Sequence, residues 1–184
     1  NSKAYYGLME KLKVTPDQKI SSMSNGQRSQ VALGLILAQN ADLLVLDDFS
    51  LGLDPGYRRL FIEYLRDFVK SEGKTVFMTS HIIQDLERLV DDCIIMDYGR
   101  ILTQMPVDRL MSTLRRYSYS EGTLPEGEGI FSPWHTGNEN EFYSFLTPDE
   151  LRPMLAAQGI AAADLKAEAP ASLEDAFIGL TGRY

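Results

Sequence analysis

The sequence predicts an α/β fold, in which a parallel sheet with flanking helices is followed by a small α+β domain. Two short apolar runs, residues 43–47 and 75–80, have the length and composition of buried strands, and an amphipathic, helix-like segment separates them. After residue 116 the composition shifts to Gly, Pro, Glu and aromatic residues with hairpin-like spacing. We therefore expect two domains, residues 1–116 and residues 117–184.

The elements of the first domain follow one another with recognisable start and stop signals. Pro55 suits the first turn of a helix, and Gly73 suits its end. Both strands should be buried on both faces, as in a parallel sheet covered by helices. The helices are expected at residues 5–12, from Gln27 to about 38, at 56–73, at 81–90 and near 107–116, and two further strands around a tight turn are expected at 93–104.

The second domain is expected to begin with hairpins, because aromatic residues alternate with Gly, Pro and Glu over residues 117–147. A helix at residues 148–159, a strand at 164–169 and a last helix at 172–184 should complete it.

The composition is that of an ordinary soluble globular protein, with 184 residues, 44% of them hydrophobic, and a formal net charge of −8. The acidic balance argues against a nucleic-acid partner. Cys93 is the one cysteine in the sequence, which leaves no internal disulfide framework. The longest strongly apolar stretch, residues 31–38, is too short to span a bilayer, and the first residues lack the apolar core of a secretory signal.

Chemically active side chains gather where the predicted elements begin and end. Ser24 and Gly26 open a helix, where a hydroxyl and exposed N–H groups favour an anion, although a plain helix cap also explains the serine. Asp47 and Asp48 end the first strand and point to opposite faces, so they cannot do the same job. One carboxylate there can hold a magnesium ion and its neighbour can orient a water, or both can be solvated or capping aspartates.

Two further residues belong to this group. Asp54 can cap the helix that begins at Pro55, or it can reach across an interface. His81 directly follows the second strand, and the carboxyl ends of parallel strands lie at one edge of a sheet. We therefore expect His81 to emerge beside the two aspartates.

These stretches resemble the ATP-binding cassette (ABC) family in order and spacing. MSNGQ at 23–27 resembles its signature motif, LLVLDDFSLGLDP at 43–55 its Walker B strand and D-loop, and TSH at 79–81 its switch histidine. SLEDAFIGLTGR near the end is similar to the close of subunits that serve ABC-2 type exporters. The resemblance implies ATP and Mg²⁺ as cofactors, Asp47 as the magnesium ligand, Asp48 and His81 as catalytic residues, and nucleotide contacts from Ser24, Asn25, Gly26, Gln27 and Asp54.

The sequence departs from the family pattern in several places. Asp48 replaces the family's catalytic glutamate, Phe49 its usual proline, and Asn25 a signature glycine. The shorter carboxylate predicts slow hydrolysis, because a misplacement of about 1 Å can be costly. The P-loop GxxxxGK[ST] and the Q-loop strand do not occur, so we interpret the chain as the C-terminal portion of a P-loop-type ABC ATPase core, lacking the Walker A region and inactive by itself.

The resemblance implies a subunit that couples ATP binding and hydrolysis to export by a separate integral membrane permease. In the family two cassettes pair head to tail, and the subunit is cytoplasmic, held at the inner face of the cell membrane by its permease. A nucleotide-binding but weakly or non-hydrolysing regulatory cassette remains an alternative, which Asp48 favours and which His81 and Asp54 oppose. A cassette that acts on DNA or ribosomes is disfavoured, because coiled-coil heptads and basic runs are absent from the sequence.

Overall fold

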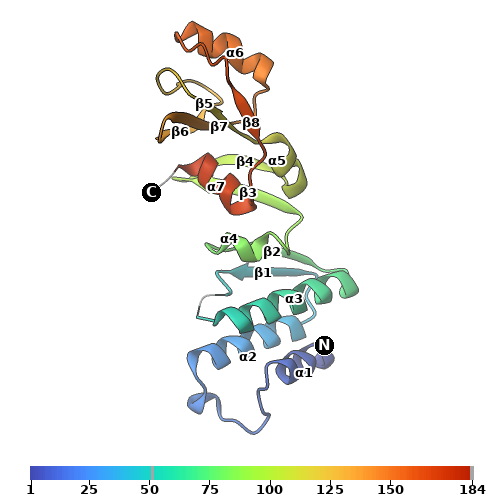
Figure 1. Cartoon of the computed structure of the whole chain (residues 1–184). Coiled ribbons are helices and arrows are strands. Elements are labelled where there is room, and N and C mark those ends of the chain that lie inside the picture. The colour runs from blue at the N-terminus through green and yellow to red at the C-terminus, as the bar shows by residue number, and fades with distance from the viewer. Residues whose placement is uncertain (51, 183–184) are drawn as a thin grey trace. The chain divides into compact units, whose positions relative to one another are not determined.

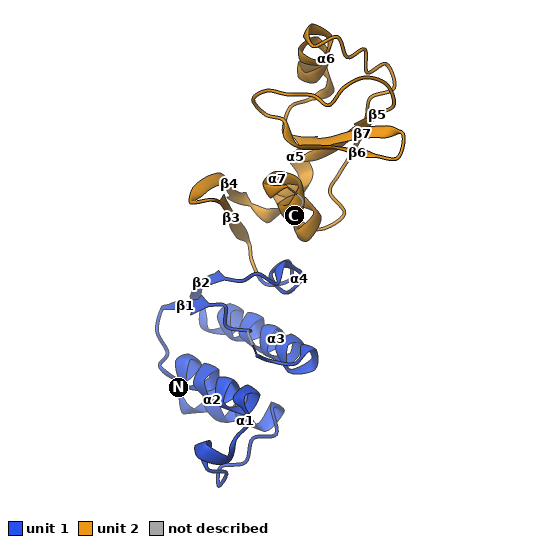
Figure 2. Ribbon diagram, turned by 90° about the vertical axis from the view of Figure 1, so that its left-hand side faces the viewer, with its two compact units in different colours: residues 1–89 blue, residues 90–184 orange. Residues whose placement is uncertain are grey.

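The computed structural model describes residues 1–50 and 52–182, which form two compact units, residues 1–89 and residues 90–184 (Figure 2). The elements of both units are labelled in Figure 1. Each unit has a hydrophobic core of its own. The candidate site residues all belong to the first unit.

The first unit places the helices α1, α2 and α3 on one side of a two-stranded parallel sheet (Figures 1 and 2). In the sheet, Leu43 lies opposite Thr75 and Asp47 opposite Thr79, so the two strands end together. The core joins Leu44 and Leu46 of the sheet to apolar residues of the helices. The elements are α1 (Ser2–Lys11), η1 (Ile20–Ser22), α2 (Asn25–Ala38), β1 (Leu43–Asp47), α3 (Pro55–Glu72), β2 (Thr75–Thr79) and α4 (Ile83–Leu86).

The helix ends in this unit are set by local chemistry that the sequence already shows. Ser24 caps α2, and Asp54 caps α3 directly before Pro55. Gly73 ends α3 in the left-handed conformation with φ 62°, which glycine adopts without steric cost. These three positions fix where α2 and α3 start and where α3 stops.

Two expectations for this unit are wrong. The strands are not buried on both faces, because Leu43, Val45 and Phe77 are 53%, 64% and 54% exposed. Side chains alternate along a strand, and the helices of the described unit cover one face only. The helix expected at residues 81–90 shrinks to α4, since the Ser80 hydroxyl accepts the N–H of Ile82 and the chain turns again after residue 86.

The second unit consists of a hairpin, a four-stranded antiparallel sheet and three helices. The hairpin turns at Tyr98 and Gly99, whose φ angles of 43° and 75° match the tight turn expected there. The sheet has the order β6-β7-β5-β8. The elements are β3 (Asp92–Asp97), β4 (Arg100–Pro106), α5 (Val107–Thr113), β5 (Arg115–Tyr119), β6 (Phe131–Thr136), β7 (Glu139–Ser144), α6 (Pro148–Ala157), β8 (Lys166–Glu168) and α7 (Leu173–Thr181).

Helices α6 and α7 pack on opposite faces of this sheet. Leu151 and Leu155 of α6 join a core with the face that carries Tyr117 and Phe142. On the other face α7 comes so close that a Cβ added at Gly179 would lie 2.6 Å from the ring of Tyr143. The last two residues of the expected C-terminal helix, 183–184, lie outside the described residues.

The compact units divide the chain at residue 90, whereas the expected domain boundary lies near residue 116. The hairpin and α5 contact α7, so they pack with the C-terminal part of the chain. The helix expected to reach residue 116 ends at Thr113, and Arg115 and Arg116 begin strand β5. A functional boundary near residue 116 stays a prediction.

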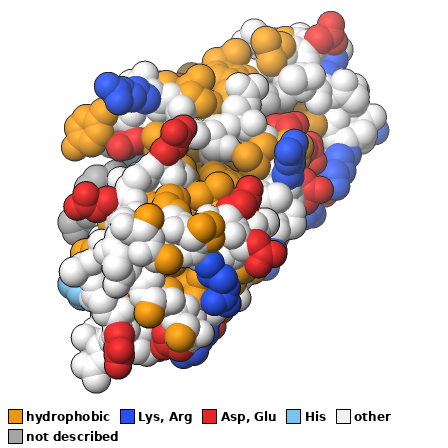
Figure 3. Space-filling model, turned by 90° about the horizontal axis from the view of Figure 1, so that it is seen from above, with side chains coloured by type: hydrophobic (Ala, Val, Ile, Leu, Met, Phe, Trp, Pro, Cys, Tyr) orange, Lys and Arg blue, Asp and Glu red, His pale blue; other side chains and the backbone are white. Residues whose placement is uncertain are grey.

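The surface seen in Figure 3 mixes side chains of every kind, with Lys and Arg interspersed among Asp, Glu and hydrophobic residues. Over residues 1–50 and 52–182, we find no helix that combines the length and the apolar character needed to cross a bilayer.

Candidate functional site

The carboxyl edge of the β1–β2 sheet brings Asp47, Asp48 and His81 together. Because Asp47 lies opposite Thr79 in the register, the residues that follow both strands emerge side by side. The Thr79 hydroxyl donates a hydrogen bond to Oδ1 of Asp47, and the N–H of Asp48 donates to the carbonyl of Thr79 over 3.1 Å. The predicted meeting of His81 with the aspartates is therefore a feature of the structure.

Asp48 and His81 are joined through their side chains. Nδ1 of His81 lies 2.9 Å from Oδ1 of Asp48, and the backbone N–H of His81 donates to the same oxygen over 3.3 Å. A carboxylate oxygen accepts, so the tautomer that fits this contact has its proton on Nδ1 and leaves Nε2 for another partner. The side chains of Asp48 and His81 are 45% and 59% exposed, which leaves both accessible from solvent.

The backbone of Asp48 takes an uncommon conformation, with φ at 43°. Aspartate tolerates this left-handed region better than most residues, because its short polar side chain can hydrogen-bond locally. The turn sends the side chain of Asp48 toward His81, while that of Asp47 pairs with Thr79. The two neighbouring carboxylates thus have different partners, as expected of adjacent residues at a strand end.

The segment that follows His81 is fastened to helix α3 by a partly buried ion pair. Nε of Arg58 lies 2.7 Å from Oδ2 of Asp85 in α4, and the side chains are only 22% and 17% exposed. Such a pair resists separation, because removing one partner leaves an uncompensated charge in a poorly solvated place. It holds the short helix α4 in place directly after His81.

The N-terminus of α2 is a capping box built by Ser24 and Gln27. Oγ of Ser24 accepts the N–H of Gln27 over 3.2 Å, and Oε1 of Gln27 accepts the N–H of Ser24 over 3.0 Å. The N–H groups of Asn25 and Gly26, in the first turn, have no acceptor within the helix. The helix therefore presents backbone donors and the O–H of Ser24, whereas the Gln27 side chain is already engaged.

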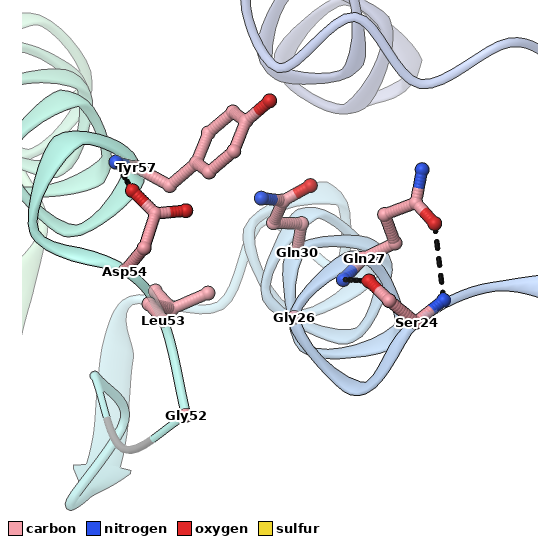
Figure 4. A pocket seen from close by; sticks show the side chains of 8 residues that line it. All are labelled: Ser24, Gly26, Gln27, Gln30, Gly52, Leu53, Asp54 and Tyr57. Atoms are coloured by element: carbon pink, nitrogen blue, oxygen red, sulfur yellow. Dashed lines mark hydrogen bonds between the residues drawn. The ribbon is translucent and has the colours of Figure 1, made fainter.

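A pocket of about 220 Å³ lies between the N-termini of α2 and α3 (Figure 4). Asp54 caps α3 there, with its Oδ1 accepting the N–H groups of Gly56 and Tyr57 over 3.0 and 3.2 Å. Asp54 was expected either to cap the helix that begins at Pro55 or to reach across an interface, and the structure shows the cap. The pocket is lined by Ser24, Gly26, Gln27, Gln30, Gly52, Leu53, Asp54 and Tyr57.

The expected site residues thus fall into two groups within the first unit. Ser24, Gly26, Gln27 and Asp54 line the pocket, and Asn25 stands beside them at the first position of α2. Asp47, Asp48 and His81 lie at the sheet edge and are not among the residues that line the pocket.

Sequence reasoning missed three residues of these groups. Thr79 pairs with Asp47, and its place directly before Ser80 and His81 at the strand end could have revealed it. Gln30 and Tyr57 line the pocket. Gln30 is the polar residue one helical turn beyond Gly26 and Gln27, immediately before an apolar run, and that position was the available signal.

The residues at the sheet edge fit a magnesium ion held mainly by a nucleotide. Across the described part of the chain, no three His, Cys, Asp or Glu side chains gather as a protein cage for a metal. Mg²⁺ is commonly bound by one or two carboxylates together with substrate phosphates and waters. Asp47, exposed at the strand end with the Thr79 hydroxyl beside it, offers that kind of limited donor set.

Comparisons with known proteins match different shares of the chain, and two relatives cover 94% of it. A family model described as "AAA domain, putative AbiEii toxin, Type IV TA system" matches residues 10–84. The Nod factor export ATP-binding protein I of Burkholderia lata is 31% identical over 182 residues, covering 94% of this chain and 58% of that protein. Its namesake from Rhizobium sp. strain N33 is 31% identical over 180 residues, with coverages of 94% and 58%.

A solved structure described as the ATP-binding subunit of an ABC transporter has a TM-score of 0.52 to this chain. It is 21% identical and covers 60% of this chain and 47% of its own, so the likeness concerns the fold. Over 94% of its length the chain is thus similar to ABC ATP-binding proteins. The α/β fold class expected for such a protein is confirmed by this likeness.

The chain spans 58% of the length of the two ABC relatives named above. Within that span three features follow the order expected for an ABC ATP-binding protein. They are the start of α2 at Ser24, the end of β1 at Asp47 and, after β2, His81. The roles of individual residues are taken up below as proposals.

Proposed function

We propose that the whole protein is the ATP-binding and ATP-hydrolysing subunit of an ABC exporter. Two such subunits pair head to tail, and their closure on ATP drives a separate integral membrane permease, which holds them at the cytoplasmic face of the cell membrane. The relatives named for Nod factor export support an export role. The observation that carries the proposal is the joint placement of Asp47 and of the Asp48–His81 pair at one edge of a parallel sheet.

In this proposal Asp48 orients the attacking water and accepts its proton. Oδ1 of Asp48 is held by the Nδ1–H of His81, so the carboxylate keeps one direction and its other oxygen faces the water. His81 contacts the γ-phosphate through its remaining ring nitrogen. The ion pair between Arg58 and Asp85 fixes the position of the segment that follows His81.

Asp47 is the proposed protein ligand of Mg²⁺. When bound with ATP, the ion neutralises charge on the phosphates. The hydroxyl of Thr79 donates to Oδ1 of Asp47 and thereby orients the carboxylate, which leaves Oδ2 for the ion. The neighbouring carboxylate of Asp48 serves the water, so each aspartate has one task.

The start of α2 is the proposed contact for a nucleotide that the second subunit carries. The O–H of Ser24 and the N–H groups of Asn25 and Gly26 at this helix start would bind the γ-phosphate, and the helix dipole would favour its charge. Gln27 contributes through the helix start that its side chain closes, and Asp54 lies on the same face. The C-terminal domain, residues 117–184, is proposed to be accessory and to make no nucleotide contact.

A regulatory cassette that binds ATP and closes with little turnover is the second candidate. It is favoured by Asp48, whose carboxylate is one methylene shorter than that of a glutamate. The side chain of Asp48 is 45% exposed, so the described residues do not enclose it in a closed site for a water. The two candidates share the nucleotide and differ in turnover.

The test uses the full-length protein and two variants, each with a single aspartate replaced. Asp47→Asn should weaken binding of Mg-ATP, measured by calorimetry, and reduce phosphate release, because the metal loses its carboxylate. Asp17→Asn, in an exposed loop before α2, is the matched control and should change neither. Equal Mg-ATP affinity in native protein and Asp47→Asn would contradict the role of Asp47, and native protein without ATP affinity would contradict the proposed function.

A further inference from the structure

The left-handed backbone of Asp48 lies between two anchored neighbours. On one side, the N–H of Asp48 donates to the carbonyl of Thr79 over 3.1 Å, which ties residue 48 to the end of β2. On the other side, Phe49 follows directly and is only 8% exposed. A φ of 43° at a residue other than glycine costs free energy and persists only where the surroundings hold it. The contacts on both sides of Asp48 therefore maintain its turn.

The ring of Phe49 packs against helix α3. Its centroid lies 5.3 Å from that of Phe61, and the two ring planes are inclined at 49°. Phe61 is 1% exposed, and both rings belong to the core that includes Leu44 and Leu46 of β1. Aromatic pairs at such distances attract one another beyond the effect of burial alone. The chain that leaves Asp48 is thus fastened to α3, whereas the backbone N–H of Asp48 is fastened to β2.

The type of residue at position 49 also limits the conformations that are open to residue 48. A proline at position 49 would push residue 48 to extended backbone, with φ at roughly −120°. Phe49 imposes no such restriction, so the φ of 43° is open to Asp48. In this conformation Oδ1 of Asp48 lies 2.9 Å from Nδ1 of His81 and accepts the N–H of His81 over 3.3 Å. The direction of the carboxylate therefore depends on residue 49.

We propose that Phe49 is a positioning residue for Asp48. Its buried ring holds the left-handed turn, and its freely rotating backbone permits that turn, so the carboxylate is directed to His81. Phe49 itself touches neither nucleotide nor water. The inference rests on the proposed function, in which Asp48 orients the attacking water, and it adds the residue that sets this orientation.

The test follows the ring of His81 and the turnover of ATP in the full-length protein. Phe49→Ala removes the ring, and Phe49→Pro pushes residue 48 to extended backbone. The ¹⁵N chemical shifts of the neutral His81 ring, assigned with a His81→Gln variant, should show the proton on Nδ1 in native protein and lose this signature in both variants. Their kcat should fall about 100-fold, because a displacement of about 1 Å at a reacting group has such an effect. KM for Mg-ATP should stay close to the native value, since the contact of Asp47 with Thr79 is untouched.

Phe68→Ala is the matched control, because it removes a phenylalanine ring of similar burial, 6% exposed, from the same core near the other end of α3. It should lower the unfolding temperature about as much as Phe49→Ala, since both leave a cavity. The tautomer of His81 and kcat should remain native in Phe68→Ala. A purely structural role of Phe49 would make the two alanine variants alike in all three measurements.

A folded Phe49→Ala or Phe49→Pro protein that keeps the native tautomer or the native kcat overturns the inference, and so does loss of the tautomer in Phe68→Ala. If both variants of residue 49 fail to fold, Phe49 is a structural residue and the inference falls as well. A native protein that does not hydrolyse ATP contradicts the hydrolysis in the proposed function. In that case the tautomer of His81, which needs no turnover, still decides whether Phe49 positions Asp48.

Discussion

Replacing Asp48 should separate stability from turnover. Its contact with His81 spans 2.9 Å, but the two side chains are 45% and 59% exposed. Exposed pairs of this kind contribute about 0–1 kcal/mol to the free energy of unfolding. Asp48→Asn should therefore shift the unfolding temperature by less than about 4 °C. Turnover should fall by about 10²–10⁴-fold, because an amide cannot accept the proton of the attacking water.

The assay is steady-state phosphate release by the full-length protein, with Mg-ATP affinity measured alongside. Affinity should persist in Asp48→Asn, since Asp47 and Thr79 still form the proposed magnesium site. Asp48→Glu restores the family's residue and extends the carboxylate by about 1.5 Å. We expect its turnover to rise, because reach limits the native enzyme. Equal turnover in native protein and Asp48→Asn would refute the role of Asp48 and favour the regulatory cassette.

Three further predictions concern the chain itself. The 184-residue chain alone should not bind Mg-ATP with micromolar affinity in calorimetry, because no P-loop occurs in it, and micromolar binding would contradict its interpretation as a partial site. Gly179→Ala should lower the free energy of unfolding by about 1–3 kcal/mol in urea titrations, since its Cβ would lie 2.6 Å from the ring of Tyr143, and a variant as stable as native would disprove this close packing. The hydroxyl of Ser120 lowers the pKa of Asp164, so this contribution to stability is present above the ordinary aspartate pKa and is lost as the pH falls through the lower folded value. Asp164→Asn should flatten the acid side of the stability curve measured by thermal unfolding, and an unchanged acid limb would contradict it.

Local sequence signals predicted the parts of the fold that depend on one or two residues. The cap at Asp54, the proline after it and the left-handed Gly73 each act over a single turn, so their effects can be read from neighbours. The turn at Tyr98 and Gly99 belongs to the same class. The resemblance of the motifs to ABC proteins then predicted that Asp47, Asp48 and His81 lie at one edge of the sheet.

Features that depend on distant partners could not be predicted in this way. The apolar strand around Val45 reads as buried on both faces, yet its exposure depends on which elements cover the sheet. The place of α4 depends on the ion pair of Asp85 with Arg58, 27 residues earlier in the numbering. Nothing in the local pattern shows that Oε1 of Gln30 lacks a hydrogen-bond partner among the described residues, because that property belongs to the packed structure.

The most direct test of the central claim is a structure of the full-length protein with Mg²⁺ and a slowly hydrolysed ATP analogue. The account predicts a head-to-tail dimer in which each γ-phosphate contacts Ser24 and Gly26 of one subunit. Asp47 and His81 of the other subunit should approach the same nucleotide from the opposite side. A nucleotide bound with neither group in contact, or with both groups supplied by one subunit, would contradict the account.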